Sequence, residues 1–192
     1  MMPLRVFIAV EIPPSIRQAI HDQTESLRAA LGRDLVRWVP VENMHLTLKF
    51  LGNVPAAHLE FVKQMLAQSA GRISPFDLTI GGLGSFPNSK RIRVLWVGIH
   101  AGSELTDLQR EIDTGAANLG YEKDDRPFSP HLTLGRVRQG VDDKTLQGIR
   151  NAAATFQLGR IGTARVESIH LYQSDLHTDG STYTKLFSAP LR

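Results

Sequence analysis

The tetrapeptide His-Leu-Thr-Leu occupies residues 45–48 and occurs again at residues 131–134, at the same place in each half of a 192-residue chain. Successive side chains of a β-strand point to opposite faces, so the histidine and threonine of each copy share one face and the leucines share the other. Leucines indicate a face packed on a core, and histidine and threonine indicate a face directed at something polar. We therefore expect two His-Thr pairs that meet across a shared groove.

The elements around the two copies follow the same order in each half. The predicted elements are strand 4–12, a helix from Ile16 to Leu31 that ends at Gly32, strand 45–51, helix 59–70, strand 76–80, strand 92–99, helix 103–119, strand 131–137, a short helix around 146–149, and strands near 156, 166–172 and 183–187. This order indicates an internal duplication, with halves of about 1–90 and 91–192. No Pro/Gly/Ser-rich linker separates the halves, so residues 1–192 are expected to form a single bilobed domain. The expected fold class is α+β, with two pseudo-symmetric lobes, each an antiparallel-rich sheet with outer helices, and an active-site groove between them.

The composition narrows the chemistry that the chain can perform. The sequence has no cysteine, which excludes a disulfide framework, a thiolate nucleophile and a Cys-ligated metal site. A net charge of +3 and a pI near 9.4 favour an anionic partner held by local contacts. The apolar run at residues 6–10 is too short for a signal peptide or a membrane-spanning helix. We expect a cytoplasmic monomer without membrane association.

Two imidazoles on facing strands suit an in-line displacement at phosphorus. The attacking and leaving oxygens lie on opposite sides of the phosphorus atom, so a base and an acid must flank it. Two histidines with a reference pKa of roughly 6.5 can share one proton near neutral pH. Thr47 and Thr133 can donate hydrogen bonds to the non-bridging oxygens. Zinc sites usually recruit more ligands than His45 and His131 supply, so we expect no metal at this pair.

The paired motif resembles the two-histidine (2H) phosphoesterase superfamily, and within it the RNA 2′,3′-cyclic phosphodiesterases, also known as 2′-5′ RNA ligases. The resemblance covers nearly the whole chain and is carried by residues 5–10, 45–52, 93–98 and 126–136. It implies that a 2′,3′-cyclic phosphate on an RNA end or a small cyclic nucleotide is opened without a metal or a nucleotide cofactor, which leaves a 2′-phosphomonoester. It also implies that His45 is the proton donor to the leaving 3′ oxygen and that His131 is the proton acceptor from water. The residues alone leave these two roles interchangeable, because the halves are pseudo-symmetric.

The resemblance implies further substrate contacts. Phe50 matches an aromatic residue that stacks on a base, and Arg136 matches an arginine that contacts phosphate. Strict alternation instead places Lys49 and Gly135 on the catalytic face, so a strand end or a β-bulge is needed to bring Phe50 and Arg136 there. Arg126 is a third candidate for substrate binding, and it can either reach the groove or cap a loop.

Other conspicuous residues are predicted to have structural or solvated roles. The remaining histidines fall in this group, and His170, which lies in a strand pattern, is the one to check. Trp38 and Trp96 can stack on bases, but apolar neighbours favour core packing for both. The basic cluster at residues 90–93 is either a solvated turn or a contact to an RNA backbone.

Other functions stay open. The same site can act in 2′-5′ RNA ligation or on ADP-ribose cyclic phosphate, and turnover of each substrate separates these possibilities. A non-catalytic RNA-end-binding module would hold phosphate between the histidines without turnover. Such a module is expected to lack one histidine or threonine of the two motifs, whereas this chain keeps all four.

Overall fold

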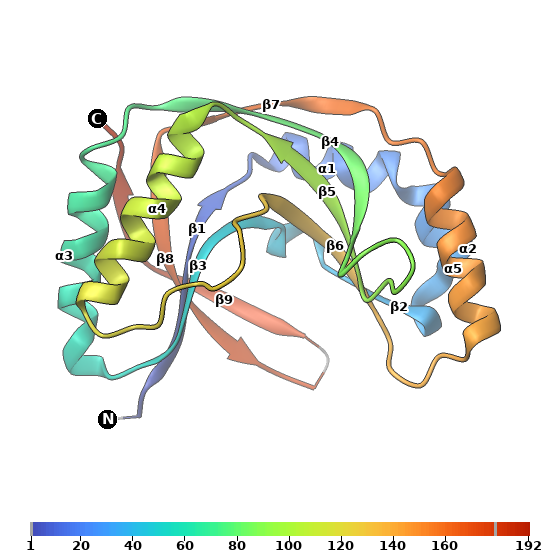
Figure 1. The fold of residues 1–192 in the computed structure, drawn as a ribbon, viewed down its shortest axis with the longest axis horizontal. Helices are drawn as coiled ribbons and strands as arrows, with labels where there is room; N and C mark the ends of the chain where they lie inside the picture. The colour runs from blue at the N-terminus through green and yellow to red at the C-terminus, as the bar shows by residue number, and fades with distance from the viewer. Residues whose placement is uncertain (1, 179) are drawn as a thin grey trace.

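Two antiparallel sheets form the centre of the structure, a computed structural model that describes residues 2–178 and 180–192 (Figure 1). Sheet A has the order β3-β1-β8-β9 and consists of β1 Leu4–Glu11, β3 His45–Val54, β8 Ser168–Leu176 and β9 Ser181–Pro190. Sheet B has the order β2-β6-β5-β4-β7 and consists of β2 Val36–Trp38, β4 Phe76–Phe86, β5 Val94–His100, β6 His131–Val137 and β7 Arg160–Val166. Buried apolar side chains from both sheets belong to one continuous core.

The two sheets share one pairing plan. In sheet A, β3 pairs with β1 and β1 with β8, just as β6 pairs with β5 and β5 with β4 in sheet B. The chain reaches this arrangement by exchanging strands, because β4 follows β3 in sequence but lies in sheet B, and β8 follows β7 but lies in sheet A. Each sheet therefore contains strands from both halves of the sequence, and the lobes in space differ from the sequence halves.

Helices lie on the outer sides of the two sheets (Figure 1). The helices α3 Leu59–Ala70 and α4 Ser103–Asn118 pack together beside sheet A, and α1 Pro14–Gln23, α2 Glu25–Leu35 and α5 Asp143–Thr155 lie on the side of sheet B. In α4, the buried residues Leu105, Leu108, Ile112 and Ala116 recur at three- and four-residue spacing and form one apolar stripe. The predicted α+β fold with two pseudo-symmetric lobes and outer helices is confirmed. Among the described helices, none is both long and apolar enough to cross a membrane.

The helix predicted from Ile16 to Leu31 is divided into α1 and α2. Thr24 lies between them, and its buried Oγ1 donates a hydrogen bond to the carbonyl oxygen of Ile20 at 2.7 Å. A threonine hydroxyl bonded to the carbonyl four residues earlier competes with regular helix geometry and bends the chain. Gly32 has a φ of 64° inside α2, so the regular helix is interrupted where glycine is predicted to end it.

The strand predicted near Phe156 is wrong. The alanine-rich segment before it continues as α5 to Thr155, because alanine is the best helix former. Asp142 caps the start of this helix by accepting a hydrogen bond from the Thr145 backbone N–H at 2.7 Å. The next strand, β7, begins only at Arg160. The short helices η1 Val41–Asn43 and η2 Ala56–His58 complete the described elements.

Candidate active site

His45 and His131 are the first residues of the corresponding strands β3 and β6. His45 is paired with Glu11 of β1, and His131 is paired with Gly98 of β5, at equivalent positions of the two sheets. The strands β3 and β6 are in contact, and the charge of His131 lowers the pKa of His45, so the two rings are close enough to interact. In the part of the chain that the structure describes, no group of three or more His, Cys, Asp or Glu side chains could hold a metal ion.

The residues that follow each histidine alternate between core and groove. Leu46 and Leu132 are fully buried, as a core-facing position requires. Thr47 and Thr133, one residue further along, are half-buried and lie on the same face of the strand as the histidine before them. Each threonine hydroxyl is therefore on the side of the strand where the imidazole lies.

A β-bulge interrupts both strands just after the threonine. The register with the neighbouring strand shifts by one residue at Leu48 in β3 and at Leu134 in β6. An extra residue in one strand reverses the face to which the following side chains point. Lys49 and Gly135 are accordingly buried, although strict alternation places both on the catalytic face.

The bulges place Phe50 and Arg136 on the histidine side of their strands. Phe50 is 61% exposed, and its ring centre lies 5.8 Å from that of Phe7, which stacks on His45 at 4.7 Å. Arg136 is exposed, and its guanidinium lowers the pKa of His131. Each of these predicted substrate-binding residues is thus near the histidine of its own strand.

Lys49 lies behind the sheet, where it anchors the segment that leads to His131. Its Nζ donates hydrogen bonds to Asp113 Oδ1 of α4 at 2.6 Å and to the backbone oxygen of Glu122 at 2.7 Å, and it lies 3.2 Å from Asp124 Oδ2.

Arg126, in the same segment before β6, is exposed. Its side chain makes no hydrogen bond or ion pair with any residue that the structure describes, and the structure shows no contact between it and the histidine pair.

The same hydrogen bond holds both imidazoles. Nδ1 of His45 lies 2.7 Å from the backbone oxygen of Asn43, and Nδ1 of His131 lies 2.7 Å from that of Ser129. A carbonyl oxygen only accepts, so Nδ1 carries a proton in both rings, and Nε2 is left to exchange a proton with a bound group. Sequence reasoning missed Asn43 and Ser129 because a backbone acceptor leaves no signature in residue type. Each of these two residues lies two positions before a motif histidine, and this shared spacing is the signal that could have identified them.

Burial lowers the pKa of both histidines. The pKa of His45 falls to about 4, mainly because the ring is desolvated; the bond to Asn43 raises this pKa and the charge of His131 lowers it. Burial also lowers the pKa of His131, the bond to Ser129 raises it, and Arg136 lowers it. Both rings are therefore mainly neutral at pH 7 without a bound anion, and negative charge placed between them raises both pKa values.

Aromatic rings surround both histidines. Phe7 stacks on His45, and Tyr183 of β9 meets the same ring edge-on with 5.1 Å between centres. Phe86 of β4 meets His131 edge-on at 4.8 Å. These contacts restrict the orientation of each imidazole and keep water from its flanks, which accounts for the lowered pKa values.

Trp96 lies on the histidine side of sheet B, not in the core as predicted. Its indole is half-buried, with its centre 6.2 Å from that of His131, and it covers Gly84 of β4, where an added Cβ would overlap the ring. The core-packing interpretation holds for Trp38, which packs against the core and donates from Nε1 to the Gly32 backbone oxygen at 3.0 Å.

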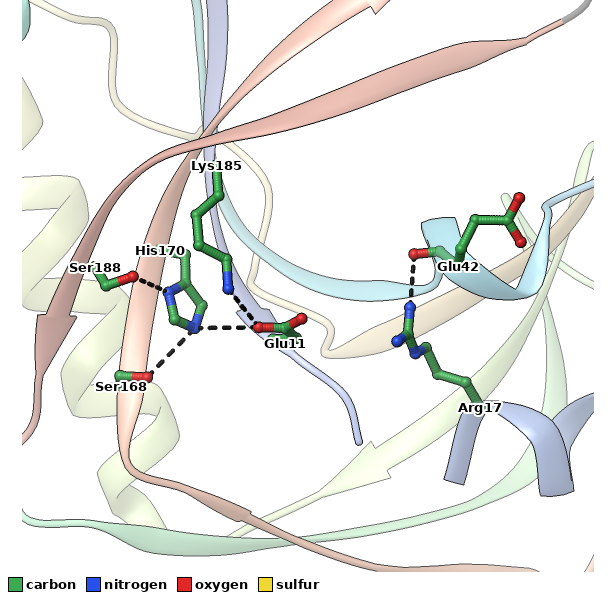
Figure 2. Close-up of polar contacts among 7 residues, drawn as sticks. All are labelled: Glu11, Arg17, Glu42, Ser168, His170, Lys185 and Ser188. Atoms are coloured by element: carbon green, nitrogen blue, oxygen red, sulfur yellow. Dashed lines mark hydrogen bonds and ion pairs between the residues drawn. The ribbon is translucent and has the colours of Figure 1, made fainter. Parts of the chain in front are cut away.

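The short helix η1, which leads into His45, is tied to two other elements. Arg17 of α1 donates a hydrogen bond from Nη1 to the backbone oxygen of Glu42 at 2.6 Å, as Figure 2 shows. Asn43 donates from Nδ2 to the backbone oxygen of Ser181 in β9 at 2.8 Å. Both contacts fix the peptide whose carbonyl group holds the imidazole of His45.

His170 belongs to a separate cluster, drawn in Figure 2. It is 7% exposed, with Nδ1 2.9 Å from Ser188 Oγ and Nε2 3.3 Å from Ser168 Oγ and 3.8 Å from Glu11 Oε2. Glu11 accepts a hydrogen bond from Lys185 Nζ at 2.6 Å. Burial lowers the pKa of His170, so the ring is mainly a neutral partner of the two serines, as a structural histidine would be.

The two corresponding sheets, each with a histidine at the start of an equivalent strand, define a two-lobed fold with a candidate paired-histidine site. The family model described as LigT like Phosphoesterase matches the chain twice, over residues 10–96 and 97–183. The chain therefore belongs to this family, and the resemblance to the two-histidine phosphoesterases is confirmed.

Several relatives match the chain over nearly its full length. The RNA 2′,3′-cyclic phosphodiesterase of Methanothermobacter thermautotrophicus is 31% identical over 185 residues, which cover 96% of this chain and 97% of the relative. A crystal structure of a Thermus thermophilus protein is similar with a TM-score of 0.81 and 28% identity, covering 98% of both chains. The structure of Escherichia coli LigT complexed with 3′-AMP is similar with a TM-score of 0.75 and 28% identity, also covering 98% of both chains.

Proposed function

We propose that the protein hydrolyses the 2′,3′-cyclic phosphate of RNA ends to a 2′-phosphomonoester by paired-histidine acid-base catalysis. One observation carries this proposal: two partly buried imidazoles at equivalent positions of contacting strands each keep Nε2 free of hydrogen bonds to the described residues, and their charges interact. The names of the relatives support the substrate, since they are RNA 2′,3′-cyclic phosphodiesterases. The complex of Escherichia coli LigT with 3′-AMP supports a nucleotide phosphate as the ligand.

In the proposed step, a water oxygen attacks phosphorus and the bond from phosphorus to the 3′ oxygen breaks. His131 accepts a proton from the water at Nε2, and His45 donates the proton on its Nε2 to the 3′ oxygen. The products are a 3′-hydroxyl and a 2′-phosphomonoester, and the proton gained by one ring balances the proton lost by the other. Positioned proton transfer of this kind contributes about 10²-fold to 10⁴-fold in each role.

The acid role of His45 requires the negative charge of the substrate. With a pKa of about 4, the free protein holds this ring neutral at pH 7. A cyclic phosphate carries one negative charge, and next to Nε2 it stabilises the imidazolium and raises the pKa. The assignment of acid and base follows the family resemblance. The bonds to Asn43 and Ser129 are the same for either assignment, so ligation in the reverse direction would exchange the roles without moving either ring.

Five further residues complete the proposed site. Thr47 and Thr133 donate hydrogen bonds to the non-bridging oxygens as negative charge develops on them. Phe50, exposed beside the aromatic cluster at His45, stacks on the terminal base. Arg136 pairs with phosphate beside His131. Arg126 is proposed as a further phosphate contact from the segment before β6.

Product analysis tests the proposal. An RNA ending in a cyclic phosphate should yield a 2′-phosphate, and either His45→Ala or His131→Ala should reduce turnover at least about 10²-fold. His58→Ala is the matched control, because this histidine is exposed and lies outside the site. Thermal unfolding shows whether each variant keeps its fold. Full turnover by a folded variant of either site histidine refutes the acid-base pair.

A panel of substrates distinguishes the alternatives. Faster turnover of ADP-ribose cyclic phosphate, or joining of RNA ends through a 2′-5′ linkage, would assign the same histidines to another substrate. RNA binding without turnover would indicate an end-binding module. We expect activity to survive EDTA, and loss of activity on chelation would indicate a mechanism that uses a metal.

A further inference from the structure

A cavity lined by arginines begins at Arg136 and extends away from the histidine pair. It has a volume of about 860 Å³ and lies where β5 and β6 pair through Val94 and Arg136, at the opposite end of that pairing from His131 and beside α5. Its lining includes five arginines, namely Arg91, Arg93, Arg136, Arg138 and Arg150. The lining contains a single acidic residue, Asp143. In a chain whose net charge is only +3, this cavity is a local concentration of positive charge.

Among the described residues, the guanidinium groups of this arginine cavity have no carboxylate partner. None of the five forms an ion pair within residues 2–178 and 180–192. Arg138 donates from Nε to the Arg33 backbone oxygen at 3.0 Å, and Arg150 donates from Nη1 to Gln147 Oε1 at 3.1 Å. Nε of Arg150 is buried and has no hydrogen-bond partner in the described part of the chain. A network built for stability would pair these charges with acids, so their free donors indicate an anionic ligand.

Arg136 connects the arginine cavity to the histidine pair. After the bulge in β6 its side chain lies on the histidine side, and its charge acts on His131, while the same residue lines the cavity. Arg136 is five residues from His131 along the strand, at most about 16 Å between backbones at roughly 3.3 Å per residue, and its side chain spans part of that length. One end of the cavity therefore lies at an arginine whose charge acts on His131, and the cavity continues away from the histidine pair, to where a longer substrate would extend.

We propose that the arginine cavity binds the phosphodiester backbone of the RNA strand on the 5′ side of the cyclic end. This inference rests on the proposed hydrolysis and specifies its substrate as an RNA oligonucleotide, not a mononucleotide. One phosphate is satisfied by one or two guanidinium groups, so five unpaired arginines fit a chain of phosphates. The cavity is also far larger than a single phosphate requires. This proposal favours the contact to an RNA backbone over the solvated turn as the interpretation of the basic cluster at residues 90–93.

A double variant in the cavity tests the inference. Arg91→Gln/Arg93→Gln removes two exposed side chains that make no hydrogen bond or ion pair with the described residues, so we expect the variant to fold. Arg110→Gln/Arg165→Gln removes the same charge from exposed positions that do not line the cavity. The measured quantity is the ratio of kcat/KM for a short RNA to kcat/KM for the nucleoside 2′,3′-cyclic phosphate with the same terminal base. This ratio should exceed one in the wild type, fall about five- to thirtyfold in the cavity variant at low salt, and stay unchanged in the control.

The salt dependence of binding provides a second readout. Fluorescence anisotropy of a 5′-labelled RNA that ends in a 2′-phosphate measures Kd without turnover. Each phosphate contact contributes roughly 0.7 to the slope of log Kd against log salt concentration for a single strand. The slope should therefore be shallower by about 1.4 in the cavity variant than in the wild type, and the control variant should keep the wild-type slope.

The outcomes separate the cavity from the active site. If RNA and mononucleotide are turned over equally and the cavity variant binds RNA as the wild type does, the inference is overturned while the proposed function stands. If neither substrate is turned over, the proposed function fails, and anisotropy alone decides about the cavity. In that case weaker binding and a shallower slope in the cavity variant still support a backbone site, and an unchanged Kd overturns it.

Discussion

Replacing His45 with glutamine is expected to remove one defined component of the protein's sensitivity to acid. The buried ring has a pKa of about 4 in the folded protein, whereas a histidine in an unfolded chain has a pKa of roughly 6.5. Between these two values the unfolded state binds the proton more strongly, so the free energy of unfolding falls as the pH falls. The contribution is fully present above pH 6.5 and is lost by about pH 4. At about 1.4 kcal/mol for each pH unit, the loss amounts to about 3–4 kcal/mol.

Urea unfolding over a pH series from about 4.5 to about 7.5 measures this effect. Glutamine does not titrate, so the stability of His45→Gln relative to the wild type should rise as the pH falls. His131 and His170 also have lowered pKa values, but both proteins contain them, so their contributions cancel in the difference. His131→Gln should shift in the same direction, because burial lowers that pKa as well. A stability difference that stays constant over the pH series would contradict a buried, neutral His45 in the folded protein.

Three further predictions follow from the site. The pH profile of kcat should lie at higher pH than that of kcat/KM, because bound phosphate raises the pKa of His45; coincident profiles would contradict this. Lys49→Met removes the ammonium that holds Asp113 and should lower the free energy of unfolding by about 1–3 kcal/mol in urea titrations, so unchanged stability would show that the ion pair contributes nothing. Gly84→Ala drives a Cβ into the indole of Trp96, which should cost about 1–3 kcal/mol and alter tryptophan fluorescence, and wild-type values of both would argue against the close contact.

The features that the sequence predicts well are those with a local period. Alternation within the two tetrapeptides predicts that Leu46 and Leu132 are buried, and both are. The spacing from Leu105 to Ala116 predicts α4 with its apolar stripe facing inward. The sequence predicts these features because buried residues recur every two positions along one face of a strand and every three to four positions along one face of a helix.

The features that the sequence does not predict depend on partners far away in the chain. A bulge at Leu48 leaves no mark in a run of apolar residues, and the sequence alone does not show that Lys49 turns to an aspartate 64 positions away. The exchange of β4 and β8 between the sheets is equally hidden, because an amphipathic strand has the same pattern in either sheet. The predicted core position of Trp96 fails for a related reason. Apolar neighbours in sequence do not reveal that Gly84 leaves space for the indole on the groove side.

The two lobes share a scaffold, and the difference between their surroundings is what can orient a substrate. Equivalent bonds from Nδ1 to a backbone oxygen hold the two imidazoles in the same way. Aromatic rings flank both histidines, but their exposed neighbours differ: Phe50 lies on the side of sheet A, and Arg136 with the arginine cavity lies on the side of sheet B. An exposed aromatic ring suits a base and arginines suit phosphates, so a strand bound with its terminal base on Phe50 would present its cyclic phosphate in one direction only. The direction of the bound strand, more than either ring, would then decide which histidine meets the leaving oxygen.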